Sequence, residues 1–423
     1  MRPKDRSGFS IAIICALTVE ADAVILLFDE VYDRYGDEYG RHPGDTNSYT
    51  VGTIGKHNVV LCYMPEMGKA SAAGVATKMK FSYPGVSLAL VVGVCGGVPL
   101  LPYSNTPIFL GDVIISHAVV RYDYGRQYPD GFKRKKGIPE NLGRPNQEIR
   151  TLFQRLQTSM ARSDLQNDIA QYLEVLRRSE PRWQYPGKAC DVLFDASYHH
   201  KHHQQATSLK CLCFNSESPG QICQEAQESS CDSLECDENR IIRRRPSDAA
   251  GASIHFGKIA SSDTVMKSGE HRDKLAKDED VAGFDMEGAG VWDELPCIII
   301  KGVCDYADSH KDKKWQAYAA ATGASSAKAF LRYWNPASSE ATRNWMRGNQ
   351  QFTLYIRKTA ERLTEAFPNN DHTKRNLWRS YLPHALSLLE EDEFKGQREQ
   401  YIDLLENIGD CLSTLILCRV WHV

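Results

Sequence analysis

No apolar run in the 423-residue sequence approaches the roughly 20 residues that a membrane-spanning helix needs. The sequence also lacks an excess of either charge, because 51 Lys and Arg residues stand against 54 Asp and Glu residues, for a net charge of -3. This balance excludes a nucleic-acid-binding protein that works by bulk positive charge. We therefore expect neither a membrane nor a nucleic acid among the partners of this protein.

The number and positions of the cysteines do not indicate a disulfide framework. The thirteen cysteines are scattered and odd in number, in a chain too long to need such a framework. A reducing compartment is the simpler interpretation, and we expect a cytoplasmic protein. The length predicts two domains, or one large domain with appendages.

The N-terminus carries the outline of a secretory signal, with a basic start, a short apolar run over 9–17 and small residues after it. The run is short, however, and Glu20 and Asp22 follow it at once. We therefore interpret Ser10–Ala16 as a buried first strand, of the near-continuous apolar kind that a covered parallel sheet requires. Thr18 is placed to cap a following helix.

Strands and helices alternate from residue 10 to residue 334, which predicts an α/β domain with a mostly parallel or mixed sheet. The expected strands are Tyr49–Ile54, Asn58–Met64, Ser87–Val94, Val113–Ala118, Ile254–Ala260, Val281–Asp285 and Pro296–Gly302. The expected helices are Gly68–Met79, Met286–Glu294 and Trp315–Trp334.

A polar insertion interrupts this pattern at about 133–250, with helical stretches at Asn146–Leu156 and Asp164–Leu176. The histidines of 199–203 and the cysteines between Cys211 and Cys236 fall in a part of it that is typical of an exposed loop. The cysteines do not repeat as paired C-x-x-C units, so the pattern does not predict a metal site. No cofactor is expected either.

After the domain 9–334, a linker at 335–345 leads into a helical region, 346–423. We expect helices at Gln350–Ala366, Lys374–Leu389 and Gly396–Leu417, as at the beginning of an α-solenoid that binds a protein partner. The last ten residues are apolar where a solenoid needs a polar cap. This predicts that the helical region continues beyond the present sequence.

Four local patterns place chemically useful groups where strands end, the edge at which α/β sheets bind ligands. They are Glu20 after the first strand, the glycines of 93–97, the pair Asp285 and Glu287, and Asp305 after the last strand. Two acids together at a buried strand end are costly unless something uses them. Each pattern also has a purely structural interpretation, as a helix cap, a first-turn acid or a tight turn.

In their order along the chain, these motifs closely resemble the nucleoside phosphorylase/nucleosidase superfamily. The stretches that carry the resemblance are Cys15–Glu20, Met67–Ala70, Gly93–Gly97, Leu110–Val113, Asp285–Glu287 and Cys304–Asp308. The sequence looks most like the fungal branch in which this domain precedes repeat or oligomerisation modules in receptors of the innate-immunity type. The resemblance implies a three-layer α/β/α fold with a mixed central sheet, followed here by an all-α region.

The resemblance also implies an N-glycosidase that releases the base of a purine nucleoside or nucleotide. Asp305 matches the residue that hydrogen-bonds to or protonates the purine, Glu287 the ribose-binding glutamate, and Glu20 the glutamate that activates water. A carboxylate beside the sugar would also stabilise the positive charge that develops there. Members are commonly oligomers, so a homo-oligomer is expected.

Further substrate-binding residues follow from the same match. Met286 corresponds to the methionine that lines the sugar, and Asp285 is grouped with it. Gly93 and Gly96 would let the backbone approach the base and the ribose.

Hydrolysis is favoured over phosphorolysis, because Val91 replaces an arginine that phosphorolytic members use to hold phosphate. Arg121 and Arg126 keep the phosphorolytic alternative open, since either could bind phosphate or the phosphates of a nucleotide. A third alternative is a non-catalytic nucleoside sensor or scaffold. Three acids retained at strand ends count against that interpretation.

Overall fold

The computed structural model describes residues 2–36, 38–135, 145–203, 213, 222–242, 251–335, 351–366, 381–382, 385–386, 388–389, 392–395 and 398–410. Contacts between Cα atoms divide the chain into two units, Met1–Trp334 and Asn335–Val423. The first unit holds the sheet and every residue proposed above for the site.

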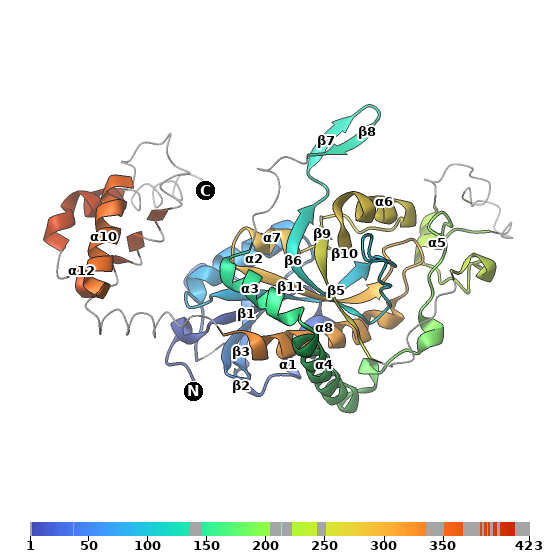
Figure 1. The fold of residues 1–423 in the computed structure, drawn as a ribbon, viewed down its shortest axis with the longest axis horizontal. Coiled ribbons are helices and arrows are strands. Elements are labelled where there is room, and N and C mark those ends of the chain that lie inside the picture. The colour runs from blue at the N-terminus through green and yellow to red at the C-terminus, as the bar shows by residue number, and fades with distance from the viewer. Residues whose placement is uncertain are drawn as a thin grey trace. The chain divides into compact units, whose positions relative to one another are not determined.

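The first unit is built on a nine-stranded mixed sheet with the order β10-β9-β6-β11-β5-β1-β4-β3-β2 (Figure 1). The strands are β1 (Ile11–Cys15), β2 (Glu30–Asp33), β3 (Ser48–Ile54), β4 (His57–Tyr63), β5 (Leu88–Gly97), β6 (Val113–Arg121), β9 (Ile254–Ser261), β10 (Val281–Asp285) and β11 (Cys297–Asp305). A separate hairpin, β7 (Gly125–Tyr128) with β8 (Gly131–Arg134), projects from the end of β6.

The sheet changes direction at β11. Strands β1, β4, β5 and β11 run parallel to one another, whereas β6 is antiparallel to β11 and has β9 and β10 parallel to it. An additional antiparallel pairing joins β10 to β5, with Gly283 opposite Gly97 and Phe284 opposite Gly96. This pairing brings the end of β10 against the glycine-rich end of β5, although many residues separate the two strands in the sequence.

Helices cover both faces of the sheet. On one face α8 (Gln316–Tyr333) packs on β5 and β11 and is flanked by α1 (Thr18–Ile25) and α4 (Ser159–Ser179). On the other, α7 (Gly288–Trp292) contacts β5, β6 and β9 and packs against α2 (Lys69–Ser82). The other α-helices among the described residues of this unit are α3 (Gln147–Leu156), α5 (Gln224–Glu228) and α6 (Gly269–Glu279). The predicted three-layer α/β/α arrangement with a mixed sheet is confirmed.

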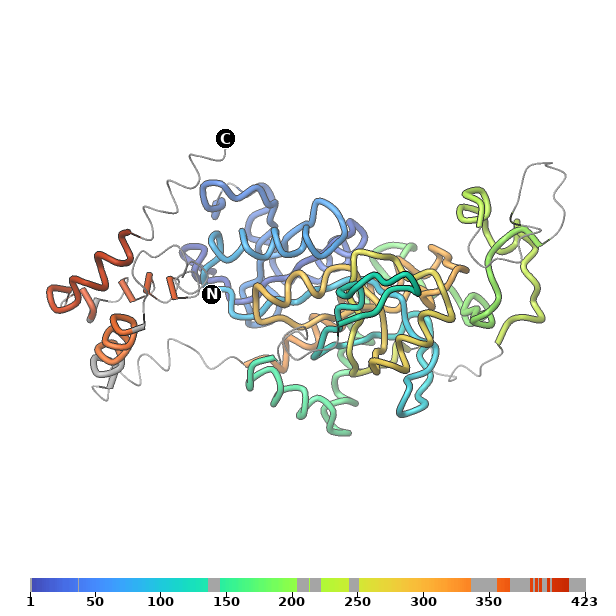
Figure 2. The backbone as a smooth tube through the Cα atoms, turned by 90° about the horizontal axis from the view of Figure 1, so that it is seen from above, coloured from blue at the N-terminus to red at the C-terminus, as the bar shows by residue number. Residues whose placement is uncertain are grey.

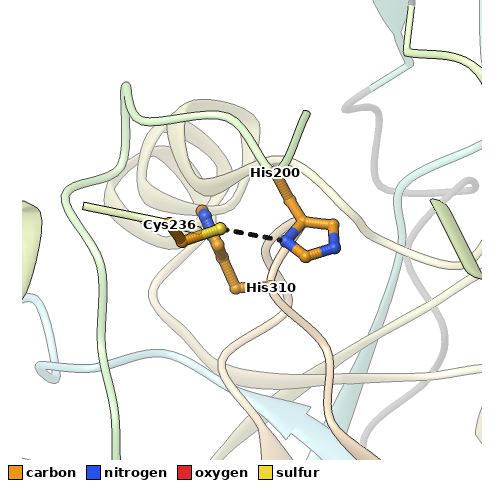
Figure 3. Close-up of side chains that lie close together, drawn as sticks. All are labelled: His200, Cys236 and His310. Atoms are coloured by element: carbon orange, nitrogen blue, oxygen red, sulfur yellow. Dashed lines mark hydrogen bonds between the residues drawn. The ribbon is translucent and has the colours of Figure 1, made fainter. Parts of the chain in front are cut away.

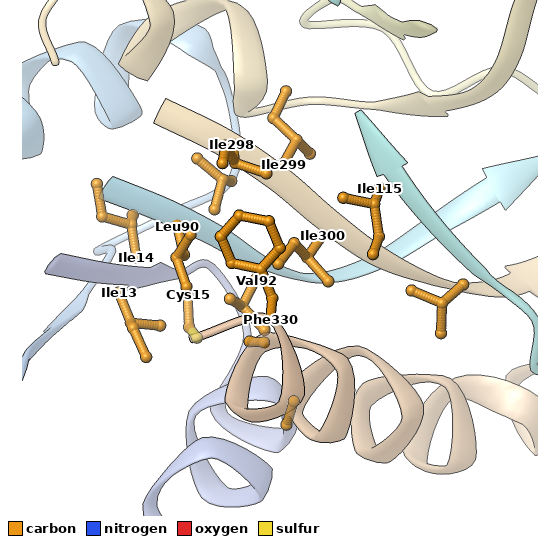
Figure 4. Packing of buried hydrophobic residues seen from close by; sticks show 14 of the residues in the cluster. Ile13, Ile14, Cys15, Leu90, Val92, Ile115, Ile298, Ile299, Ile300 and Phe330 are labelled. Carbon is orange, nitrogen blue, oxygen red and sulfur yellow. The ribbon is translucent and has the colours of Figure 1, made fainter. Parts of the chain in front are cut away.

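The core lies where the central strands meet α8. Figure 4 shows Phe330 of α8 among side chains of β1, β5 and β11, including Val92 and Ile300. Central strands buried on both faces account for the near-continuous apolar runs in the sequence. They also make a polar side chain in one of these strands conspicuous.

Two strands run further than predicted. β5 continues through Gly96 and Gly97, and β11 continues to Asp305. Glycine and aspartate are poor strand formers, so local propensity ended both predictions too early. Pairing with neighbouring strands keeps both segments extended, and this places the predicted site residues on the sheet itself.

The expectation of an exposed loop around the histidines and cysteines of the insertion is wrong for two of these residues, because His200 and Cys213 are only 4% and 1% exposed. Residues 204–212 and 214–221 lie outside the described residues. Elsewhere in the insertion, α4 packs against α8 and Trp183 is fully buried. The polar composition hid this packing because the buried apolar positions are widely spaced. Seen from above in Figure 2, the yellow-green later part of the insertion lies at the opposite end of the unit from the blue N-terminal strands.

The second unit is helical over α10 (Gln351–Ala366), α12 (Asp392–Lys395) and 402–410. It has its own small apolar cluster, which includes Ile356, Leu363, Phe394 and Leu404. Most of the linker at 335–345 and most of the helix expected at Lys374–Leu389 lie outside the described residues. The solenoid interpretation therefore stays a prediction. Among the described residues, no helix is long and apolar enough to cross a membrane.

We expect a fragment of residues 1–334 to fold without the second unit, because each unit has a separate apolar core. Near-UV circular dichroism of the fragment should match the signal of the corresponding part of the full chain, and thermal unfolding should be a single cooperative transition. An aggregated fragment, or one with no near-UV signal, would place the boundary elsewhere.

Candidate active site

The predicted site residues meet around the glycine-rich end of β5. Glu20 comes from the first turn of α1, Asp285 and Glu287 from the end of β10, and Asp305 from the end of β11. β5 lies between β1 and β11 and also pairs with β10. It is therefore the strand that all three groups share.

Glu20 is buried and held by the backbone. Its Oε2 accepts hydrogen bonds from the amides of Ala16 and Leu17, both 2.9 Å away, and its Oε1 accepts one from Val94 at 2.7 Å. Burial raises the pKa of Glu20, while Lys301 opposes this change. A fixed carboxylate with a raised pKa is a suitable general base near neutral pH.

Two glycines on β5 make room for two acids. A Cβ atom at Gly93 would lie 2.1 Å from Glu20 Oε1, and a Cβ atom at Gly96 would lie 2.9 Å from Asp305 Oδ1. At about 3.3 Å per residue, these two positions are about 10 Å apart along the strand. Gly93 and Gly96 thus each leave room on β5 for one carboxylate, with Val94 and Cys95 between them.

The structure adds a residue that the sequence analysis did not single out. Lys301 of β11 is 1% exposed, and its Nζ donates to Glu287 Oε2 at 2.8 Å. Burial opposes the charge of Lys301, but Glu287, Glu20 and Asp285 outweigh it and raise the pKa of the ammonium group. A single cation is thus shared by three carboxyl groups. A lysine inside the apolar run Pro296–Val303 was the signal that could have revealed it.

Asp285 is the third carboxyl group near Lys301, and it also contacts the backbone at the start of α7. Its Oδ2 accepts a hydrogen bond from the amide of Gly288 at 2.9 Å, so it also caps α7. Burial raises its pKa to about 6; Lys301 opposes the change and Glu287 adds to it. Met286 lies between the two acids and is half-buried.

A β-bulge near the end of β11 sets the orientation of Asp305. Val303 pairs with Cys95 and Asp305 with Gly96, so Cys304 has no partner of its own in β5. Such a bulge turns the following side chain, as often happens beside active sites. Asp305 Oδ1 accepts from the amide of Ala307 at 2.8 Å and lies 3.1 Å from Lys311 Nζ. Lys311 is a second cation that the sequence analysis missed.

Only one of the two candidate phosphate-binding arginines, Arg121, lies near the acidic residues of the site. Arg121 ends β6 beside Ser261, and its guanidinium lies 3.8 Å from the carboxylate of Asp293. Arg126 is exposed on the projecting hairpin. The structure therefore places Arg121 at the site edge with an acidic partner, and Arg126 away from it.

A helix N-terminus that could hold an anion is already occupied. The amide of Lys69, at the start of α2, donates to Asp263 Oδ1 at 2.7 Å. The ammonium group of Lys69 lies 2.5 Å from Asp123 Oδ2 and 3.7 Å from Asp263 Oδ2. The chain's own carboxylates thus take the place that a phosphate would favour.

A surface hollow of about 400 Å³ lies elsewhere on the unit, and Asp29, Lys56, Tyr172, Lys328 and Arg332 are among the residues that line it. None of the predicted site residues lines this hollow. The chemistry is concentrated at the acid group, so we assign the candidate site there.

Comparison with known protein families shows which part of the chain, and which of the site residues, match a family. Residues 10–175 match the family described as the phosphorylase superfamily. The predicted resemblance is confirmed. The matched segment contains Glu20, Gly93 and Gly96, whereas Asp285, Glu287 and Asp305 lie beyond it.

A long fungal protein is also similar to this chain. It is a nucleotide-binding leucine-rich repeat (NLR)-like protein of Hyaloscypha variabilis, 28% identical over 331 residues. The alignment covers 76% of this chain and 29% of the relative, so the chain spans less than a third of that protein's length. The predicted similarity to the fungal NLR-like branch is confirmed.

Solved structures of similar fold include futalosine hydrolase of Helicobacter pylori, with 15% identity and a TM-score of 0.43. Another is 5'-methylthioadenosine/S-adenosylhomocysteine nucleosidase from Neisseria meningitidis in complex with methylthio-immucillin-A, with 16% identity and a TM-score of 0.44. Each alignment covers 77% of this chain and 99% of the solved chain. At such identities and scores, the substrate has to be argued from the side chains.

We expect Lys301→Met to destabilise the protein by about 3–5 kcal/mol, because it leaves buried carboxylates without their cation. Adding Glu287→Gln to this variant should restore part of the loss. Chemical denaturation measures both changes. The exposed Lys277→Met is the matched control and should stay within about 0.5 kcal/mol of the wild type. Equal stability of Lys301→Met and Lys277→Met would contradict the charge sharing described above.

Proposed function

We propose that this chain hydrolyses the N-glycosidic bond of a purine nucleoside or nucleotide. The observation that carries the proposal is the buried group of three carboxyls around Lys301, beside the bare backbone at Gly93. Breaking a glycosidic bond leaves positive charge on the ribose, and a buried site with more carboxyls than cations favours that charge.

In this proposal the ribose lies beside the Gly93 end of the glycine-rich segment, between Glu20 and Glu287. Glu287 binds the ribose hydroxyls, and its pairing with Lys301 holds its carboxylate in one orientation. Met286 covers the apolar side of the sugar. Asp285 acts mainly by charge and by capping α7, since its Oδ2 already accepts from Gly288.

Glu20 is proposed as the base that activates water. Three backbone amides fix its carboxylate, so it needs no rearrangement to accept the proton. Its raised pKa makes its conjugate acid weak enough to hold that proton as the carbon–oxygen bond forms. The water oxygen adds to the ribose carbon, and the electron pair of the glycosidic bond leaves with the base.

The leaving base is proposed to lie over Gly96, against Asp305. Asp305 is paired with Lys311, so the two side chains together offer the purine a hydrogen-bond acceptor and an ammonium proton. The ammonium group of Lys311 can then donate the proton that neutralises the departing base, while the carboxylate of Asp305 holds Lys311 in place and binds the purine. This pairing extends the role expected for Asp305 alone.

Water is favoured over phosphate for electrostatic reasons. The carboxyls at the ribose would repel a phosphate dianion, and the nearby Arg121, Lys69 and Lys301 each have an acidic partner. Phosphorolysis with Arg121 as the anion contact is the alternative that the experiment below can establish.

We expect purified protein to release free base from a purine nucleoside or nucleotide without added phosphate. Glu20→Gln should lower kcat by about 100- to 10,000-fold with little change in substrate affinity, because it removes the general base. Asp305→Asn should also lower kcat more than it weakens binding. A screen of adenosine, inosine and ATP by chromatography measures both effects.

The wild-type rate should fall as the pH is lowered through the pKa of Glu20, because burial raises that pKa and protonation removes the base form. The exposed Glu30→Gln and Asp278→Asn are matched controls and should keep wild-type rates. Strict dependence on phosphate, with ribose 1-phosphate as product, would replace hydrolysis by phosphorolysis. Unchanged kcat in Glu20→Gln would remove its assigned role.

A further inference from the structure

Histidines and cysteines of the insertion come together in two groups, and His310, from the segment after β11, joins one of them. One consists of His200, Cys236 and His310, whose ligand atoms lie within 4.8 Å of one another. Figure 3 shows these three side chains pointing toward a common centre. The other consists of His202, Cys213 and Cys223, which meet the same distance limit.

Cys231 lies beside the first group, next to His200, although it is not one of the three residues whose ligand atoms all lie within 4.8 Å of one another. His200 Nδ1 lies 3.5 Å from Cys236 Sγ and 3.6 Å from Cys231 Sγ. One ring nitrogen thus faces two sulfur atoms, although it has one lone pair to share with a thiol. With His310, the set contains two imidazoles and two thiols.

These distances match those of a tetrahedral metal centre. Zinc–nitrogen bonds of about 2.0–2.1 Å and zinc–sulfur bonds of about 2.3 Å place the two ligand atoms about 3.6 Å apart at a tetrahedral angle. Two sulfur ligands would lie about 3.8 Å apart by the same geometry. In the second group, Cys213 Sγ and Cys223 Sγ are 3.7 Å apart, and His202 Nδ1 lies 3.3 Å and 3.5 Å from them.

The surroundings orient the histidines as metal ligands require. The Nε2 of His200 lies 2.9 Å from the carbonyl oxygen of Ser229 and donates to it, which leaves Nδ1 as the unprotonated nitrogen. The ring of His310 is stacked on Phe194 with centroids 4.1 Å apart. Both ligand rings are therefore fixed before any ion arrives.

His310 supplies an independent observation. Both of its ring nitrogens are buried, and neither has a hydrogen-bond partner among the described residues. Buried polar atoms are rarely left in that state, and a bound ion is a recognised explanation. A metal at the centre of the first group would give one of these nitrogens its partner.

From these observations we propose that the insertion binds zinc, with His200, Cys231, Cys236 and His310 as ligands of one ion, and His202, Cys213 and Cys223 as ligands of a second. Mixed imidazole and thiolate donors select zinc over calcium or magnesium, which prefer oxygen. Each thiol loses its proton to solvent when the metal–sulfur bond forms, and no redox change is needed.

The first ion would tie the insertion to the active-site loop. His310 follows the segment that carries Asp305 and immediately precedes Lys311, while His200, Cys231 and Cys236 belong to the insertion. The amide of His200 also donates to Ser309 Oγ at 3.0 Å. Zinc would thus hold the pair Asp305–Lys311 in place from outside the sheet, as a structural site rather than a catalytic one.

The test is the zinc content of the full chain, purified without chelators and measured by inductively coupled plasma mass spectrometry. We expect two equivalents in the wild type and one in His310→Ala, and one in Cys223→Ser. Cys190→Ser, which removes a cysteine outside both groups, is the matched control and should keep two. His310→Cys should regain the ion that His310→Ala loses, because thiolate also binds zinc.

Cobalt substitution gives a second measurement that does not depend on yield or stability. The wild type should show the visible and sulfur-to-metal bands of tetrahedral cobalt with thiolate ligands, and His310→Ala should lose about half of their intensity. The proposal is overturned if the purified chain contains no metal and its cysteines are oxidised. Mass spectrometry would reveal that oxidation as a mass 2 Da lower for each disulfide-bonded pair. A zinc content that is equal in His310→Ala and the wild type overturns the proposal as well.

Discussion

The buried ammonium group of Lys301 is the constraint on which the site depends. It lies in a central strand, opposite Gly93 of β5 and Ile114 of β6, where nearly every other side chain is apolar. Replacing buried ion pairs by apolar residues often leaves stability unchanged or improves it, so burial of this charge is poorly explained by folding alone. Its carboxyl neighbours explain it better. Without the cation, three acids could not be kept together inside the sheet.

The glycines of β5 set the spacing of the site. Gly93 makes room for Glu20 and Gly96 makes room for Asp305, so the positions of the two glycines fix where the two acids lie along the strand. The pairing of β10 with the same end of β5 adds Glu287 and Asp285. Three segments that are far apart in the sequence are thus positioned by the backbone of one strand, whose pairings leave little freedom for any of them.

Much of the fold could be predicted, because apolar periodicity and glycine turns are local signals. The strands β3 and β4 and the helix α8 follow directly from such patterns. Local patterns could not predict which strands pair or which side chains from distant segments come into contact. The extension of β11 through Cys304, the contact of Lys301 with Glu287, and the grouping of His200 with His310 all depend on residues that are distant in the chain. The spacing of the cysteines did not predict a metal site for the same reason, because the proposed ligands of each zinc ion come from separate segments of the chain.

The central claim is that the buried acids stabilise positive charge on the ribose. Binding of two nucleoside analogues tests it most directly, one with a cationic nitrogen in the sugar ring and one with a neutral ring of the same shape. Isothermal titration calorimetry should show at least about 100-fold tighter binding of the cationic analogue, as transition-state resemblance predicts. The preference should shrink in Glu287→Gln. Equal affinity for the two analogues in the wild type would contradict the account.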